Sequence, residues 1–105
     1  MKADEISENN ATYTPVTGVS EGNAIRKGNI VLLYIQVANN IPPTQWVKIG
    51  SISPQPVTSM FTTITLHSMV YFALARVTRS SGDVDIYHTY TSTYNTYTFT
   101  VMLLV

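Results

Sequence analysis

Hydrophobic and polar residues alternate with a period of two along most of this chain. The clearest segment is Ile30–Val37, and such alternation is typical of a β-strand, whose successive side chains point to opposite faces. One face of this segment carries Val31, Leu33, Ile35 and Val37. The opposite face carries Ile30, Leu32 and Tyr34. Because both faces are apolar, we expect this strand to be covered on both sides.

The C-terminal segment is also apolar on both of its strand faces. From Thr89 it alternates Tyr and Thr and then runs apolar through Met102-Leu103-Leu104-Val105. As a strand, it turns one set of side chains to the core: Tyr97, Phe99, Val101, Leu103 and Val105. One core in so small a domain cannot cover Met102 and Leu104 as well. We therefore expect a neighbouring subunit to cover an interface of four side chains: Met102, Leu104, Leu32 and Tyr34.

The remaining pattern predicts further short strands separated by turns. Gly28-Asn29 joins two strand-like runs and predicts a tight hairpin. Pro15 places the first strand at a sheet edge. The polar stretch Tyr90–Asn95 predicts the last hairpin connection. The expected strands besides Ile30–Val37 and the last are Tyr13–Val19, Ala24–Lys27, Gln45–Ile52, Val57–Leu66, Ser68–Thr78 and Val84–His88. Strands at such short spacing predict an all-β fold, an antiparallel sandwich or barrel, and we expect the β-sandwich.

Composition and charge narrow the class of protein. The 105 residues fit one domain, with 45% hydrophobic and only 11% charged residues, a formal net charge of zero and no Cys. Because the net charge is zero, we expect no nucleic-acid partner. We expect no membrane insertion either, because no apolar run has the length of a membrane helix. A surface so poor in charge favours association.

The charges are concentrated at the start of the chain. Lys2, Asp4, Glu5 and Glu8 all lie within the first eight residues. We therefore expect residues 1–11 to form a flexible tail or a linker stub and residues 12–105 to form the β-sandwich head domain. A native tail and the remainder of a longer upstream protein are both open interpretations.

No arrangement of residues predicts catalysis. Asp83 and Asp85 share one face of a strand, but glycosidase carboxylates flank their substrate from separate elements. A solvated start of a strand is the simpler interpretation of this pair. His67 and His88 lie on different strands without a third metal ligand. We expect no enzyme activity, no metal site and no cofactor.

The aromatic residues near the C-terminus are more informative. Tyr residues are interleaved there with Thr, Ser and Asn, and aromatic faces beside hydroxyls and amides suit saccharides as well as protein contacts. With the charges of the adjoining loop, the candidate saccharide contacts are Tyr87, His88, Tyr90, Tyr94, Asp83 and Arg79. Arg76 flanks the same loop. Packing in the core or between subunits is the alternative for each tyrosine, and it is the role expected of Trp46.

Several short motifs follow one another in an order that resembles a known family. These motifs are similar to the C-terminal domains of phage tail fibres and baseplate receptor-binding proteins. Ala24–Val31 (AIRKGNIV) resembles the "vrkrGNxV" start of those domains, and Trp46–Gly50 resembles their "W-x-x-I-G" strand. Pro54 and Pro56 fall at the family's proline turn. Ser81–Ile86 resembles its "xxGxVxI" hairpin, and Tyr97–Val105 its hydrophobic closing strand.

The resemblance implies a function. It implies a jelly-roll-like, homotrimeric head at the tip of a phage or prophage tail or baseplate, exposed to the extracellular medium as part of the virion. Such a head attaches to host cell-surface polysaccharide and contacts other tail or baseplate proteins through its N-terminal side. The chain departs from the family at Ser51–Pro56, where an "LPxGYRP" element often stands, and no ligand-binding motif transfers residue by residue.

Two other functions remain open. A structural baseplate or fibre module would dock other proteins without binding glycans. A bacterial carbohydrate-binding module would more often be monomeric.

Overall fold

The computed structural model describes residues 10–38, 41–66, 71–89 and 97–105, which form eight β-strands and no helix. The strands are β1 (Thr12–Pro15), β2 (Ser20–Lys27), β3 (Ile30–Val37), β4 (Val47–Ser53), β5 (Met60–Leu66), β6 (Tyr71–Val77), β7 (Asp83–His88) and β8 (Tyr97–Leu104). The expected tail, apart from Asn10 and Ala11, and the expected connection Tyr90–Asn95 lie outside the described residues.

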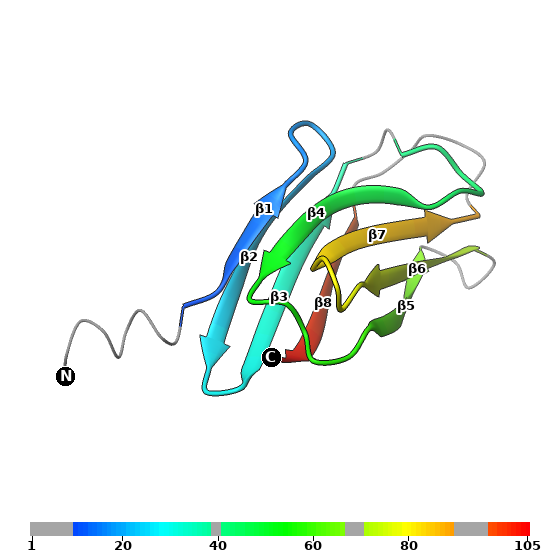
Figure 1. Cartoon of the computed structure of the whole chain (residues 1–105). Coiled ribbons are helices and arrows are strands. Elements are labelled where there is room, and N and C mark those ends of the chain that lie inside the picture. Colours follow the sequence, from blue (N-terminus) through cyan, green and yellow to red (C-terminus); the bar gives the residue numbers. More distant parts are fainter. Residues whose placement is uncertain (1–9, 39–40, 67–70, 90–96) are drawn as a thin grey trace.

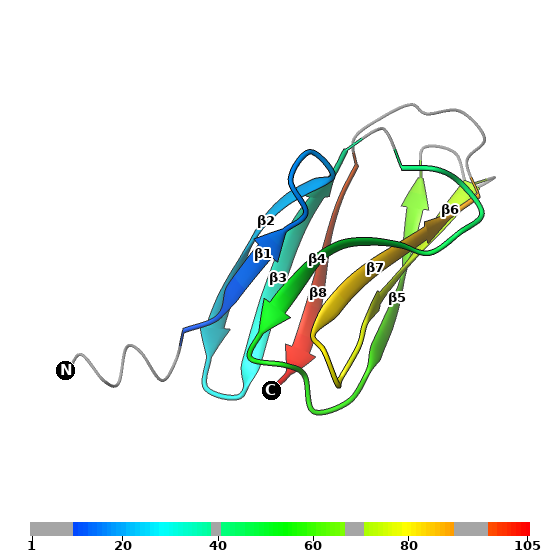
Figure 2. The ribbon, with the colours of Figure 1, turned by 45° about the horizontal axis from the view of Figure 1, so that its top comes forward.

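The strands form two antiparallel sheets that pack face to face (Figure 1; Figure 2). The five-stranded sheet has the order β1-β4-β7-β6-β5, and the three-stranded sheet has the order β2-β3-β8. In the larger sheet β5, β6 and β7 are consecutive neighbours and β4 pairs with β7, which is a Greek-key arrangement. The predicted all-β sandwich is confirmed, and the jelly-roll likeness remains part of the proposal below.

The core lies between the sheets and follows the alternation of the sequence. All four side chains predicted for the inner face of β3 are fully buried, and β8 adds Phe99, Val101 and Leu103 from the same sheet. The five-stranded sheet contributes the rest, mainly Ile49, Ile52, Ile64, Ala73, Ala75, Val77, Val84 and Ile86. Strand alternation alone therefore assigns the inner and outer faces correctly wherever the pattern is regular.

The β2–β3 hairpin forms as predicted, with Lys27 paired to Ile30 across Gly28-Asn29. Gly28 has a φ of +62°, whereas Asn29 does not have a positive φ. A positive φ at the first central residue only is the pattern of a type II′ turn, which favours glycine at that position.

Several strand boundaries differ from the sequence prediction, most of all at β1, β2 and β5. β2 begins at Ser20 rather than Ala24. β1 lies at a sheet edge as expected, but it ends at Pro15, and the amide of Val19 donates to the Val16 carbonyl in a turn that contains Gly18 at a φ of +79°. β5 begins at Met60 rather than Val57, because the Val57 amide donates to the Leu104 carbonyl of the other sheet.

A buried hydrogen-bonded cluster joins the two sheets. The hydroxyls of Tyr13 on β1 and Ser20 on β2 both donate to the Ile49 carbonyl on β4 and lie 2.7 Å apart. Burial raises the pKa of the Tyr13 phenol above its ordinary value, against a smaller lowering by Ser20. Gly50 makes room for this ring, since a methyl group at Gly50 would collide with the Tyr13 side chain.

Candidate functional site

The outer face of the three-stranded sheet is apolar and solvent-exposed. We call it the apolar face, and it consists of Ile25, Ile30, Leu32, Tyr34, Met102 and Leu104. Strand register places Ile25, Leu32 and Met102 opposite one another across all three strands. Ile25 is 64% exposed and Met102 60%. The four side chains predicted as an interface thus lie on one continuous surface.

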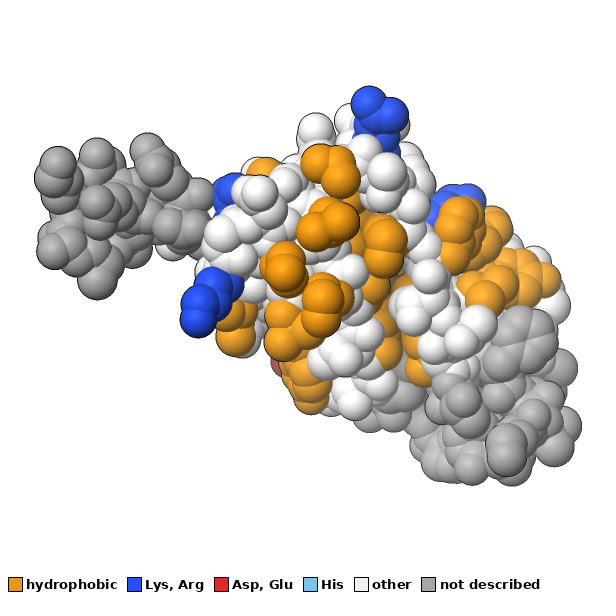
Figure 3. Space-filling model, turned by 90° about the horizontal axis from the view of Figure 1, so that it is seen from below, with side chains coloured by type: hydrophobic (Ala, Val, Ile, Leu, Met, Phe, Trp, Pro, Cys, Tyr) orange, Lys and Arg blue, Asp and Glu red, His pale blue; other side chains and the backbone are white. Residues whose placement is uncertain are grey.

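Polar residues border the apolar face at one end, on the same side of the sheet. Asn23 and Thr100 flank Tyr34, and the next row consists of Glu21, Gln36 and Thr98. Hydrophobic side chains also gather on the side of the molecule seen from below, with few charged groups among them (Figure 3). An apolar centre with a polar rim is the usual construction of a protein–protein interface.

The outer face of the five-stranded sheet carries a different group of side chains. We call it the Trp46 cluster, and it consists of Trp46, Phe61, Arg76, Asp85 and Tyr87. The Trp46 ring lies 5.6 Å from the Tyr87 ring and 6.5 Å from the Phe61 ring, measured between centroids. The Arg76 guanidinium carbon lies 4.2 Å above the Trp46 ring centre, which is a cation–π contact.

Strand register explains this assembly. Phe61 on β5 pairs with Arg76 on β6, and Arg76 pairs with Asp85 on β7. Tyr87 follows two residues later on the same face, and Trp46 directly precedes β4 beside it. Four neighbouring stretches of chain therefore deliver one side chain or two each to a single patch.

Paired charges border the rings. Arg76 Nη2 lies 3.3 Å from Asp85 Oδ2, and Lys48 Nζ lies 3.1 Å from Asp83 Oδ1. The Asp83–Asp85 spacing does place both carboxylates on one strand face, as expected. Each carboxylate is neutralised by a cation from a neighbouring strand.

The saccharide contacts expected from the sequence do not all meet. Tyr87 and Asp83 lie on the outer face of β7. Arg79 is exposed in the loop between β6 and β7, where its backbone amide donates to Ser59 Oγ. Tyr90 and Tyr94 lie outside the described residues, as does His67.

His88 points into the protein rather than to its surface. Its side chain is part of a residue only 5% exposed, and Nε2 donates to the Ile41 carbonyl oxygen at 2.7 Å. The Thr44 amide also donates to the His88 carbonyl. In this structure the imidazole holds residues 41–44 against the end of β7, so a direct contact between His88 and a saccharide does not fit its burial.

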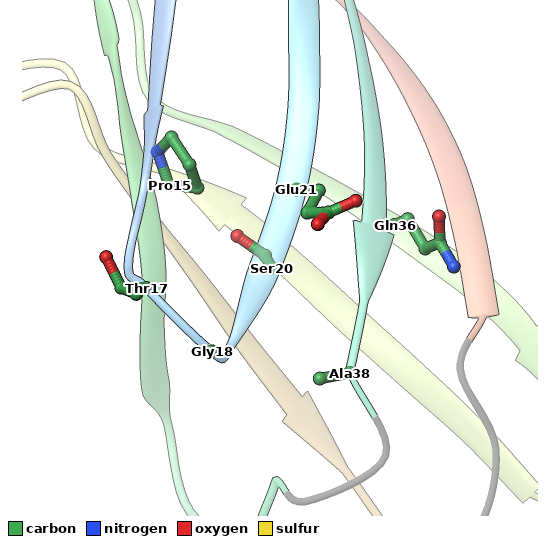
Figure 4. A pocket seen from close by; sticks show the side chains of 7 residues that line it. All are labelled: Pro15, Thr17, Gly18, Ser20, Glu21, Gln36 and Ala38. Atoms are coloured by element: carbon green, nitrogen blue, oxygen red, sulfur yellow. The ribbon is translucent and has the colours of Figure 1, made fainter.

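A shallow open hollow lies near the β1–β2 turn, lined by Pro15, Thr17, Gly18, Ser20, Glu21, Gln36 and Ala38 (Figure 4). Glu21 is its one charged side chain. The Ser20 hydroxyl points to the opposite side of β2, where it is engaged with Ile49. The hollow therefore offers little convergent chemistry.

Within residues 10–38, 41–66, 71–89 and 97–105, no three His, Cys, Asp or Glu side chains come together to hold a metal ion. Nor do these residues form a helix of the length and apolarity needed to cross a membrane.

The sequence did not single out Phe61, which is 62% exposed. Trp46 is expected to pack in the core or between subunits; at 37% exposure it does not lie in the core of this chain, and packing between subunits stays a prediction. Pairing of β5 with β6 and of β6 with β7 was the signal needed to group Phe61 with Arg76 and Tyr87. That pairing is not readable from one segment alone.

Comparison of this chain with protein-family models, with curated proteins and with solved structures finds no match. Function is therefore inferred from these surfaces and from the motif resemblance.

Proposed function

We propose that this chain is the receptor-binding head of a phage or prophage tail or baseplate. In this proposal it is a jelly-roll-like sandwich that assembles as a homotrimer and attaches to host cell-surface saccharides. The order of the sequence motifs supports the proposed family. The apolar face is the structural observation that carries the proposal.

The apolar face is best covered by further copies of the same chain. Six large apolar side chains stand together where an ordinary solvent-facing sheet carries polar residues. Leu32 and Met102, at its centre, are 44% and 60% exposed. Covering a few hundred Å² per subunit contributes several kcal/mol at about 25 cal/mol per Å². Association costs an amount of the same order, so the surface suits a specific oligomer with good packing.

Assembly also serves adhesion. Identical saccharide sites on one rigid trimer bind a repeating polysaccharide at several points at once, which strengthens individually weak contacts. This arrangement suits attachment to a cell surface better than a single tight pocket would.

Two measurements on the purified chain test the proposal. Light scattering should give the molar mass of a trimer, and an array of bacterial surface polysaccharides should retain the protein. The Leu32→Asp variant should be monomeric and should bind the same polysaccharide more weakly.

Other outcomes would point elsewhere. A stable monomer that binds polysaccharide would favour a carbohydrate-binding module. A trimer that binds no polysaccharide but captures a tail or baseplate protein would favour a structural docking module.

A further inference from the structure

We infer that the Trp46 cluster is the saccharide-binding surface of this chain and that its ligand is a neutral glycan. This inference rests on the proposed function and assigns a position and a ligand class to it. The cluster differs from the site expected from the sequence, which consists of Tyr87, His88, Tyr90, Tyr94, Asp83 and Arg79. It shares only Tyr87 with that site.

The rings of the cluster present apolar area to solvent instead of to the core. Phe61 is 62% exposed and Trp46 37% exposed. The Trp46 ring meets the Phe61 ring edge to face at 68° and the Tyr87 ring at 50°, so the rings do not cover one another as a parallel stack would. A pyranose ring has a face of C–H groups that packs on such exposed aromatic surface.

Arg76 fixes the orientation of Trp46. Its guanidinium covers the indole at 4.2 Å and is itself held by Asp85 at 3.3 Å. An indole fixed in this way loses little rotamer freedom when a ligand binds, and that pre-organisation favours affinity. Arg76 is therefore a positioning residue for the ring, in addition to being a hydrogen-bond donor.

Polar groups with unused capacity stand beside the rings. The Arg76 and Asp85 side chains are 32% and 15% exposed, so part of each is open to a ligand. Arg76 Nε itself is buried and, among the described residues, has no hydrogen-bond partner, so the remainder of the guanidinium is the part that a ligand meets. Asp85 uses Oδ2 for Arg76, which leaves Oδ1 as an acceptor. A few fixed donors and acceptors around an apolar platform are the usual features of a small-ligand site. Saccharide hydroxyls both donate and accept, so they match this mixture.

The charge balance of the surface selects a neutral glycan. Lys48 and Arg76 are balanced by Asp83 and Asp85, each cation with its own carboxylate. An acidic glycan would approach two carboxylates on the same strand and would have to separate an existing ion pair. A neutral glycan meets neither obstacle.

The make-up of the cluster also favours a sugar over a protein partner. Its apolar part consists of three rings bordered directly by two ion pairs. The centre of a protein interface is usually depleted of charged residues. The apolar face on the other sheet is the surface that has the character of a protein interface.

Calorimetric titration with soluble oligosaccharides tests the inference without interference from multivalency. The probes are a neutral set and a uronic-acid-containing set, both cut from bacterial surface polysaccharides. Phe61→Ala and Trp46→Ala should weaken binding of the neutral probe about tenfold or more. Val57→Ala truncates a side chain that is 51% exposed and belongs to neither surface, so it should bind as the wild type does. Trp46 is the only tryptophan in the chain, so its emission should change saturably as the neutral probe is added to the wild type.

The possible results separate an error in the position of the site from an error in the proposed function. Wild-type binding that Phe61→Ala and Trp46→Ala leave unchanged would overturn the site while the proposed function stands. Preference for the acidic probes would overturn the neutral class. Failure of the wild type to bind any probe or the polysaccharides themselves would overturn both the site and saccharide attachment. Because Phe61 is mostly exposed, Phe61→Ala should keep the fold, which circular dichroism checks.

Discussion

The outer faces of the two sheets are built by the same alternation of residues but differ in chemistry. The three-stranded sheet exposes mainly aliphatic side chains, centred on Ile25, Leu32 and Met102. The five-stranded sheet exposes three aromatic rings beside two ion pairs. Aliphatic surface has no directional preference and is suited to burial against another chain. Rings held by charged groups have fixed orientation and are suited to a small ligand. The comparison suggests that one face assembles and the other recognises.

The largest expected effect comes from a charge at the centre of the apolar face. Leu32→Asp would bury an unpaired carboxylate in the assembly, and an unpaired buried charge costs several kcal/mol. The oligomer should dissociate to monomers, as measured by light scattering across a dilution series. Gln36→Asp introduces the same charge on the same strand and face, outside the apolar centre, and should retain the assembly. If Leu32→Asp and Gln36→Asp have the same molar mass across the dilution series, the apolar face is not the surface that assembles.

The next effect concerns the core that supports both faces equally. Tyr13→Phe removes the hydroxyl that contacts Ser20 and Ile49 and leaves buried partners less satisfied. We expect a loss of about 1–3 kcal/mol in the free energy of unfolding, measured by chemical denaturation. Because the hydrogen bonds of Tyr13 join the two sheets, Tyr13→Phe should weaken assembly and ligand binding only by lowering the stability of the fold. Loss of assembly without loss of ligand binding, or the reverse, would show that Tyr13 supports one face more than the other.

The same tyrosine predicts a pH dependence. Its pKa is raised in the folded state because burial disfavours the phenolate. The corresponding stability is therefore fully present below the ordinary pKa of about 10 and is lost as the pH rises through the higher folded-state value. Denaturation at a series of pH values from about 9 to 11 should show a steeper loss for the wild type than for Tyr13→Phe. Parallel curves would contradict the assigned cause.

A smaller effect should follow from Arg76→Lys. Lysine keeps the charge but lacks the planar group that lies on the Trp46 ring, and cation–π contacts at exposed sites contribute about 0.5–1 kcal/mol. Unfolding should change by about that amount, and Trp46 emission should shift. An unchanged emission spectrum would show that Arg76 does not position the ring. Arg26→Lys, on the three-stranded sheet, is the matched control.

The smallest effect is expected at the exposed ion pair. Lys48→Met removes the partner of Asp83, and such pairs contribute about 0–1 kcal/mol. Stability should hardly change, while the unpaired Asp83 should make the Trp46 face more negative. Any binding of acidic probes should then fall further. Improved binding of acidic probes would contradict the role given to charge balance.

The sequence by itself determined the local structure and the inner faces of the regular strands. Alternation over Ile30–Val37 predicts which side chains are buried, and Gly28-Asn29 predicts the hairpin, because both signals act between near neighbours. The same alternation grouped Leu32 and Tyr34 on one strand and Met102 and Leu104 on another. Irregular stretches such as Val57–Leu66 were less well predicted, since there a hydrogen bond to the other sheet decides where the strand begins.

Only the tertiary structure decided which strands became neighbours, and with them the Trp46 cluster. Many polar and apolar residues separate Phe61, Arg76 and Tyr87 along the chain. Nothing in the local sequence indicates that β5, β6 and β7 lie side by side. The inward position of His88, by contrast, follows from alternation within β7, because His88 shares a face with Val84 and Ile86. Pairing between strands depends on the summed packing of the whole sandwich, and no single segment contains that information.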